Sequence, residues 1–320
     1  MSFARRKFIV TGGIVLAGAA GGAAWLSSSS SRLARFARQL ARDVPRSPTA
    51  PQFKPTPRAW PENAISACWI GHATVLIGFY GVNILIDPVF STRVGIGFGL
   101  GTIGPKRYVA PALTTHELPR IDLLLISHAH MDHLDIPSLR RLRPDTSTVT
   151  ARGTADLCTS AGLKSVTEIG WGQTVRCGAA RGEIVIEAFE VKHWGRRWPS
   201  KRDRGYNGYV LRREGRALLF AGDTGYTAAF AELKSRGPFD LALMPIGAYN
   251  PWIRNHCTPE EAVRMADLAG AKRIAPIHHK TFKLSEEPMD EPLERFEQAL
   301  RGEPDRIAFR HIGESCCISL

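Results

Sequence analysis

The residues best suited to chemistry lie in the stretch Ser127-His128-Ala129-His130-Met131-Asp132-His133. Four potential metal ligands fall within its last six residues, directly after the apolar run 123–127. Imidazole nitrogen together with carboxylate oxygen suits Zn²⁺, and also Fe or Mn. A chain with ten histidines is not expected to produce this cluster by chance, so the spacing predicts a metal centre.

The same spacing leaves room for two ions. His128 and His130 are two residues apart, so in an extended chain they point the same way and suit one ion. Asp132 and His133 lie where the chain turns toward the next helix, and they suit a second ion.

Further ligands are expected at other strand ends, because loops present side chains there on rigid support. His193 follows the predicted strand 184–191, Asp223 follows 217–221 and His278 follows 273–277. An aspartate can bridge two cations through its two oxygens. The alternative for Asp223 is a turn-forming residue close to two glycines.

The elements that must position these residues follow from the hydrophobic pattern. Strands are predicted at 67–70, 74–79, 82–87, 123–127, 184–191, 206–211, 217–221, 241–245 and 273–277, and helices at 137–142, 258–269 and 292–300. Tyr80-Gly81 predicts a hairpin between two of the strands, and 95–104 is predicted to be a glycine-rich loop. This order predicts a layered α+β domain with sheets at its centre.

The N-terminus predicts a targeting segment. Arg5, Arg6 and Lys7 precede an uncharged run of 19 residues, and small residues follow, as in an export signal of the twin-arginine type. A cleaved signal, a retained membrane anchor and neither of these stay open as alternatives. We therefore divide the chain into a signal or anchor at 1–31, a basic, proline-rich linker at 32–63 and a catalytic domain at 64–320, and expect a periplasmic or membrane-anchored protein.

Composition and charge narrow the class of protein. The chain has 320 residues, 44% of them hydrophobic, which argues against wholesale disorder and against a multi-span membrane protein. The net charge is +12, and residues 1–46 contribute eight Lys/Arg and one acid to it. This basic excess favours an anionic membrane surface and does not require nucleic acid. The six cysteines include no CxxC pair, so neither a disulfide framework nor a cysteine zinc site is expected.

The HxHxDH motif, a later His, the Gly-Asp-Thr-Gly turn and a final His resemble the metallo-β-lactamase superfamily. More narrowly, the chain resembles the N-acyl-phosphatidylethanolamine-hydrolysing phospholipase D family over roughly residues 65–315. The matching stretches include Ile70-Gly-His-Ala-Thr-Val, Leu85-Ile-Asp-Pro-Val-Phe-Ser, Phe220-Ala-Gly-Asp-Thr-Gly-Tyr, Pro245-Ile-Gly-Ala-Tyr and Thr258-Pro-Glu-Glu-Ala-Val-Arg.

The resemblance implies a four-layer αββα sandwich with the metallo-β-lactamase fold and two zinc ions at one end of its sheets. It assigns His128, His130 and His193 to the first ion, Asp132, His133 and His278 to the second, and Asp223 as the bridge. It places a histidine near the reacting phosphodiester at His256, whose alternative is an exposed loop residue. His279 competes with His278 for the ligand position. Asp87 is expected to orient a ligand histidine, with an Asp-Pro turn as its alternative.

The resemblance also implies the chemistry. A hydroxide held between two zinc ions would attack the phosphorus of a membrane phospholipid and release N-acylethanolamine and phosphatidic acid. Asp132 would orient the nucleophile, and His256 would bind the phosphate or protonate the leaving oxygen. Trp194, Trp198 and Trp252 are candidates for an acyl groove or for ordinary packing, and a homo-oligomer is compatible with the sequence. A lactonase or another small phosphoester hydrolase on the same scaffold and a non-catalytic lipid-binding protein stay open as alternatives.

Overall fold

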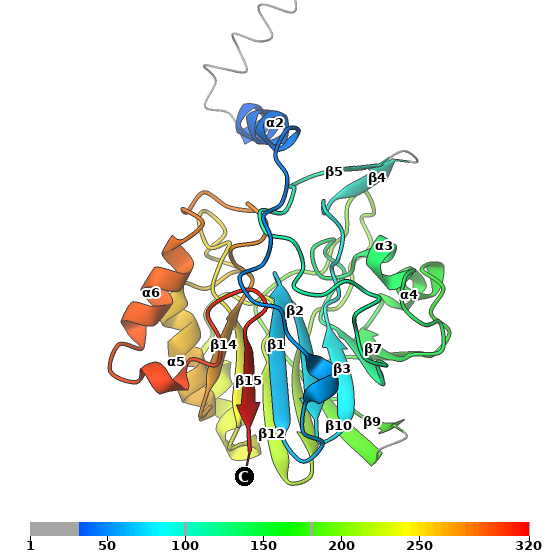
Figure 1. Cartoon of the computed structure of the whole chain (residues 1–320), viewed down its shortest axis with the longest axis vertical. Helices are drawn as coiled ribbons and strands as arrows, with labels where there is room; N and C mark the ends of the chain where they lie inside the picture. Colours follow the sequence, from blue (N-terminus) through cyan, green and yellow to red (C-terminus); the bar gives the residue numbers. More distant parts are fainter. Residues whose placement is uncertain (1–31, 99–100, 180–181, 320) are drawn as a thin grey trace, which may run out of the picture.

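Two β-sheets pack face to face in the computed structural model, and helices cover their outer faces (Figure 1). The structure describes residues 32–98, 101–179 and 182–319. The predicted signal or anchor at 1–31 lies outside the described residues. Within them, none of the helices combines the length and the apolar character needed to cross a bilayer.

The first sheet has, among the described residues, seven strands in the order β15-β1-β2-β3-β6-β7-β8. Their bounds are β1 Ile65–Gly71, β2 Thr74–Phe79, β3 Val82–Ile86, β6 Leu123–Ile126, β7 Ser147–Ala151, β8 Val166–Ile169 and β15 Ser315–Ile318. The predicted hairpin at Tyr80-Gly81 is confirmed, and both residues have positive φ, as a two-residue hairpin turn requires. The strands from β3 to β8 run parallel, so their carboxyl ends share one edge of the sheet.

The second sheet has, in the described part of the chain, six strands in the order β14-β13-β12-β11-β10-β9. Their bounds are β9 Thr174–Ala179, β10 Gly182–Phe189, β11 Gly208–Arg213, β12 Arg216–Phe220, β13 Leu241–Pro245 and β14 Ile274–Ile277. β12, β13 and β14 pair in parallel, so the residues that follow β12 and β14 emerge at the same edge.

The largest apolar core lies between the sheets and joins residues such as Trp69, Ile77, Tyr209 and Leu243. A second core packs α5 (Pro259–Ala269), α6 (Glu291–Ala299) and the 3-10 helix η2 (Ala228–Arg236) on the second sheet. A third packs the short helices α3 (Ile136–Leu139) and α4 (Ala155–Ser160) on the first sheet. The predicted αββα sandwich is confirmed.

The segment predicted as a linker begins with a helix, α2 (Arg32–Asp43), at the end of the molecule where many loops gather (Figure 1). Residues 44–63 contain the one-turn 3-10 helix η1 (Pro57–Ala59) and otherwise run as an extended arm. The glycine-rich segment predicted as a loop contains a small hairpin of β4 (Ile96–Phe98) and β5 (Gly101–Ile103), which corrects that prediction. Another one-turn helix, η3 (Pro304–Arg306), precedes β15.

Candidate metal centre

The candidate site is assembled from residues that follow strands of both sheets. His72 follows β1, the 128–133 motif follows β6 and His193 follows β10, while Asp223 and His278 follow β12 and β14. Loops at the carboxyl ends of parallel strands meet at one edge, which is where sites of layered folds form. The fold therefore brings together seven sequence-predicted residues that are up to 150 positions apart.

One group of donor atoms consists of His128, His130, His193 and Asp223, whose ligand atoms all lie within 4.8 Å of one another. Nε2 of His128 lies 2.9 Å from Nδ1 of His130, and Nε2 of His193 lies 3.2 Å from that same nitrogen. Ligands about 2.0–2.1 Å from a tetrahedral zinc ion lie roughly 3.3 Å apart. The spacing of the three nitrogens therefore fits an ion between them.

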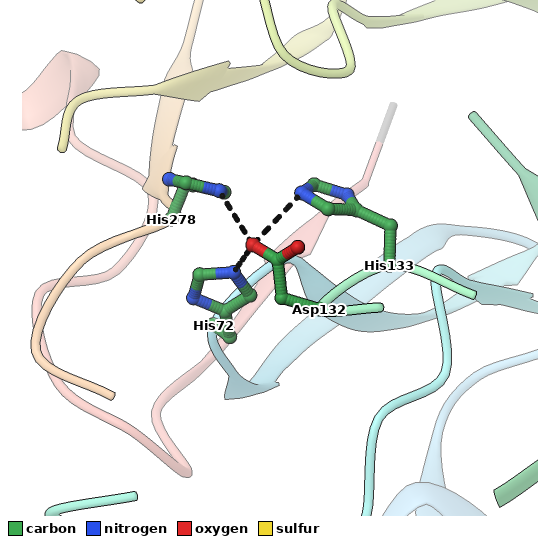
Figure 2. A group of neighbouring side chains, drawn as sticks. All are labelled: His72, Asp132, His133 and His278. Carbon is green, nitrogen blue, oxygen red and sulfur yellow. Dashed lines mark hydrogen bonds and ion pairs between the residues drawn. The ribbon is translucent and has the colours of Figure 1, made fainter. Parts of the chain in front are cut away.

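A second group consists of His72, Asp132, His133 and His278. Figure 2 shows the three imidazoles directed at the carboxylate of Asp132 from three sides. Their Nε2 atoms lie 2.9 Å (His72), 3.7 Å (His133) and 3.4 Å (His278) from its Oδ2. The predicted trio of Asp132, His133 and His278 is thus brought together, and His72 joins it.

Asp223 lies between the two groups. Its Oδ2 is 3.1 Å from Nε2 of both His133 and His278, and 3.7 Å from Nε2 of His193. The carboxylate is buried, and its Oδ1 has no hydrogen-bond partner in the described part of the chain. This position between the two groups is the one that the expected bridge requires, and the bridging role stays a prediction.

Burial and charge determine the protonation of these groups. Burial lowers the pKa of His130 to about 4 and those of His128 and His193 well below the usual value. Burial would also lower the pKa of His278, but the carboxylates of Asp223 and Asp132 outweigh it and raise that pKa to about 9. The first group therefore offers neutral imidazoles at pH 7, which is the form that binds metal.

Hydrogen bonds to neighbouring groups fix the ring orientations. Nδ1 of His133 donates to Oδ2 of Asp87 at 2.6 Å, and Nδ1 of His193 donates to the carbonyl of Asn255 at 2.9 Å. Each contact leaves Nε2 directed into the site, which is how proteins orient ligand imidazoles. Asp87 thus makes the contact that its expected orienting role requires, and that role stays a prediction. Ser127 also donates to Asp87 through its hydroxyl and its amide.

His256 also reaches the site. Its side chain is buried, which is incompatible with an exposed loop residue, and its Nδ1 lies 3.9 Å from Oδ2 of Asp223. Burial lowers the pKa of His256 to about 4, so the ring is neutral at pH 7. It lines a cavity of about 180 Å³ together with His130, Asp132, Trp194, Asp223, Ala248, Trp252, His278 and Leu284. Trp198 does not line this cavity and is 64% exposed.

The competing ligand candidate His279 points elsewhere. Its ring stacks on Trp69 with the ring centroids 4.4 Å apart, and it belongs to neither group of donor atoms. His278 is therefore the residue that the structure directs into the site.

The residues present fit bound cations. Several buried donor atoms in the centre have no hydrogen-bond partner among the described residues, namely His133 Nε2, Asp223 Oδ1, His256 Nδ1 and both ring nitrogens of His278. Buried polar atoms of this kind are costly unless something binds them. Nitrogen and oxygen donors converging on two points are suited to divalent metals.

His72 was not identified from the sequence as a site residue. It stands in the Ile70-Gly-His-Ala-Thr-Val stretch, directly after a strand. Its backbone adds to the site, because the carbonyl of His72 accepts a hydrogen bond from the amide of His278 at 3.0 Å. A single histidine without a second ligand nearby in sequence carries no metal-binding pattern, so only the fold reveals it.

The fold and this centre are those of a metal-dependent hydrolase, and comparison with known sequences places the chain in the same class. The family model described as a beta-lactamase superfamily domain matches residues 82–279. The chain belongs to this superfamily of metal-dependent hydrolases.

Individual relatives are similar over most of the chain. It is 32% identical over 282 residues to an uncharacterised protein of Mycobacterium tuberculosis, covering 84% of this chain and 73% of that one. It is 32% identical over 259 residues to N-acyl-phosphatidylethanolamine-hydrolyzing phospholipase D 1 of Caenorhabditis elegans, covering 76% and 72%. Among solved structures, the isothiocyanate hydrolase from Delia radicum gut bacteria superposes with a TM-score of 0.63 at 20% identity, covering 80% of this chain and 100% of that one, which shows a shared fold.

Proposed function

We propose that this protein is a zinc-dependent phosphodiesterase that hydrolyses membrane phospholipids, releasing N-acylethanolamine and phosphatidic acid from N-acyl-phosphatidylethanolamine. The observation that carries the proposal is the similarity to the Caenorhabditis elegans phospholipase over 76% of this chain. The two donor groups with Asp223 between them support it, because paired cations suit phosphoryl transfer.

Two divalent ions, which we propose to be zinc, would be held by the two groups and would supply Lewis acidity and an activated water. The protein's own side chains do the rest. Asp132 lines the cavity with its Oδ2 contacted by His72, so it is placed to orient the attacking water by accepting a hydrogen bond from it. The buried surroundings exclude competing water, because most ligand side chains are hardly exposed.

His256 is placed to hydrogen-bond a phosphoryl oxygen. With its pKa at about 4, only about one ring in a thousand is protonated at pH 7. A neutral imidazole still donates through one N–H, so we assign His256 to binding the phosphate rather than to protonating the leaving oxygen. Trp194 and Trp252, each partly exposed, would contact the lipid at the rim of the cavity.

A second candidate is a lactonase or another hydrolase of small phosphoesters. The size of the cavity favours it, since about 180 Å³ is small for a lipid and below the usual range of 300–1,000 Å³ for ligand pockets. A phospholipid would therefore have to place only its phosphodiester in the cavity and keep its chains outside.

The test is turnover of N-acyl-phosphatidylethanolamine in mixed micelles by the full chain loaded with zinc. We expect N-acylethanolamine release that a chelator abolishes and that Asp132→Asn lowers by more than about 100-fold. Asp203→Asn is the matched control, because Asp203 is exposed and pairs only with Arg196 among the described residues. No release from protein that metal analysis shows to hold two zinc ions would exclude this substrate, and small lactones and phosphodiesters would be assayed next.

The remaining expectations concern location. We propose that residues 1–31 direct export and that the protein works at a membrane surface of the cell envelope, with no role in binding nucleic acid. The arginines of α2 support the membrane assignment, because basic side chains are attracted to anionic lipid.

A further inference from the structure

A large cleft lies between α2 and the loops at the site's end of the molecule. It has a volume of about 720 Å³. From α2 it is lined by Arg35, Arg38, Gln39 and Arg42, and from the loops mainly by Trp252, Lys283 and Leu284. Figure 1 shows α2 at the same end as the β4–β5 hairpin.

This cleft adjoins the metal centre. Trp252 and Leu284 line both the cleft and the smaller cavity that contains Asp132 and His256. The two spaces are therefore neighbours, and the side chains of Trp252 and Leu284 contribute to the walls of both. The predicted linker thus supplies one wall of a second binding space.

α2 is attached to the loop that closes the cleft. Nε2 of Gln39 donates to the carbonyl of Lys283 at 2.7 Å, and Nη2 of Arg35 pairs with Oε1 of Glu286 at 2.9 Å. Ala34 is buried. These contacts fix the orientation of the helix and hence the side from which its arginines approach the cleft.

The charge of the lining is positive. The lining contains more basic than acidic side chains. The basic ones are Arg35, Arg38, Arg42 and Lys283, and the acidic ones are Asp43 and Glu286. Asp43 is buried and already binds the Arg46 guanidinium at 2.6 Å, so it does little to neutralise the cleft. The planar guanidinium group matches the oxygens of a phosphate, which makes an arginine-lined cleft suited to phosphate.

Exposed apolar side chains accompany the arginines of the cleft: Trp252 lines it, and Ile253 follows Trp252 in the chain. Trp252 is 39% exposed and the next residue, Ile253, is 46% exposed. Tryptophan favours the boundary between lipid and water, and arginines next to it favour anionic headgroups. Free phosphate would use the arginines but would leave these apolar side chains unexplained.

We propose that this cleft binds the phosphate headgroup of an anionic phospholipid in the bilayer, and that it thereby docks the protein with its metal centre facing the membrane. The inference rests on the proposed lipid substrate. The docked lipid is a neighbour of the substrate in the same leaflet, because the substrate's own phosphodiester occupies the metal centre.

The test measures amide hydrogen exchange in the full chain on vesicles of phosphatidylcholine, with and without phosphatidylglycerol. Metal-depleted protein is used, so that no turnover contributes and failure of the proposed reaction leaves the result unaffected. We expect exchange to slow in 32–43 and 282–286 only when phosphatidylglycerol is present, and added salt to reverse the effect.

The variant is Arg35→Gln with Arg38→Gln and Arg42→Gln. Each arginine near an anionic surface contributes about fivefold to binding, so we expect the apparent affinity for phosphatidylglycerol vesicles to fall roughly 100-fold. The matched control changes three exposed arginines outside the cleft, Arg143, Arg176 and Arg301, to Gln, and should retain the protection. Replacing the three α2 arginines by Lys keeps their charge and should retain much of the protection from exchange. This variant shows whether a loss of protection in the Gln variant comes from the lost charge or from an altered helix.

Three results would overturn the proposal. One is equal protection on neutral and anionic vesicles, and another is full protection of the Gln variant. The third is the same protection from inorganic phosphate alone, which would make the cleft a site for free phosphate.

Discussion

Nε2 of His72 lies 2.9 Å from Oδ2 of Asp132, although the two residues are 60 positions apart in the chain. Burial lowers the pKa of His72 to about 3, so its ring is neutral and must donate this hydrogen bond to the carboxylate. The contact fixes Oδ2 of Asp132, the oxygen that also lies 3.7 Å from Nε2 of His133 and 3.4 Å from Nε2 of His278. His72 thus joins the loop after β1 to the metal-binding motif after β6.

Replacing His72 should therefore weaken the binding of the ion held by the second group of donor atoms. We expect His72→Ala to lower zinc affinity at that position by about 10–100-fold, which is the usual cost of losing a partner of a ligand. His72→Gln should retain more affinity, because its amide can still donate to Asp132. Zinc titration of both variants, with His279→Gln as the control beside the site, measures the difference. Equal affinities for His72→Ala and the wild type would show that Asp132 needs no such partner.

Part of this architecture could be predicted from the sequence. The predicted strands 74–79 and 241–245 agree with β2 and β13 to the residue, since each is a continuous apolar run ending at a turn. β7, α4, β8 and β9 were not predicted. Threonine and charged residues are common in them and several of their side chains face solvent, so their hydrophobic periodicity is weak.

The residues of the candidate site could also be predicted only in part. The motif at 128–133 could be found because its ligands are adjacent in sequence, and His193, Asp223 and His278 because each follows a strand. The contact of His72 with Asp132 depends on how β1 and β6 are placed in the sheet, with β2 and β3 between them. Periodicity alone does not give strand order, so this contact required the structure.

The contact of Asp87 with His133 predicts a second effect on metal binding. Asp87 is fully buried, and its two oxygens accept from Ser127 and from Nδ1 of His133. Asp87→Asn keeps the size but replaces one acceptor with a donor, which would face the donor of His133. We expect about a 10–100-fold loss of zinc affinity.

The control for Asp87 is Asp122→Asn, because Asp122 lies outside the donor groups and its side chain, among the described residues, accepts only from the backbone amide of Asn83. Zinc titration together with circular dichroism separates lost affinity from lost folding. A folded Asp87→Asn protein with unchanged affinity would contradict the orienting role of Asp87.

The helix that follows His256 begins with a capping box. Oγ1 of Thr258 accepts from the amide of Glu261, and the carboxylate of Glu261 accepts from the amide of Thr258. Thr258→Ala removes one half of this pair, and we expect the free energy of unfolding to fall by about 1 kcal/mol. Urea denaturation measures it. Thr159→Ala, within the exposed part of α4, should cost less than about 0.5 kcal/mol.

The low pKa of His256 makes the stability of the metal-free protein depend on pH. Its pKa is about 4 in the folded chain and about 6.5 when unfolded, so between these values the unfolded chain binds more protons. Stability therefore falls as the pH drops through this window. The titration of His256 makes the free energy of unfolding about 2 kcal/mol lower at pH 5 than at pH 7.

His256→Gln removes this titration without changing the size of the side chain greatly. We expect the loss of unfolding free energy between pH 7 and pH 5 to be about 2 kcal/mol smaller in the variant than in the wild type, both measured by urea denaturation with chelator present. His116→Gln is the control, because His116 is exposed and belongs neither to the donor groups nor to the lining of the cavity. An unchanged pH dependence in His256→Gln would mean that the ring is solvated in solution, and it would remove the argument that His256 meets the phosphate as a neutral hydrogen-bond donor.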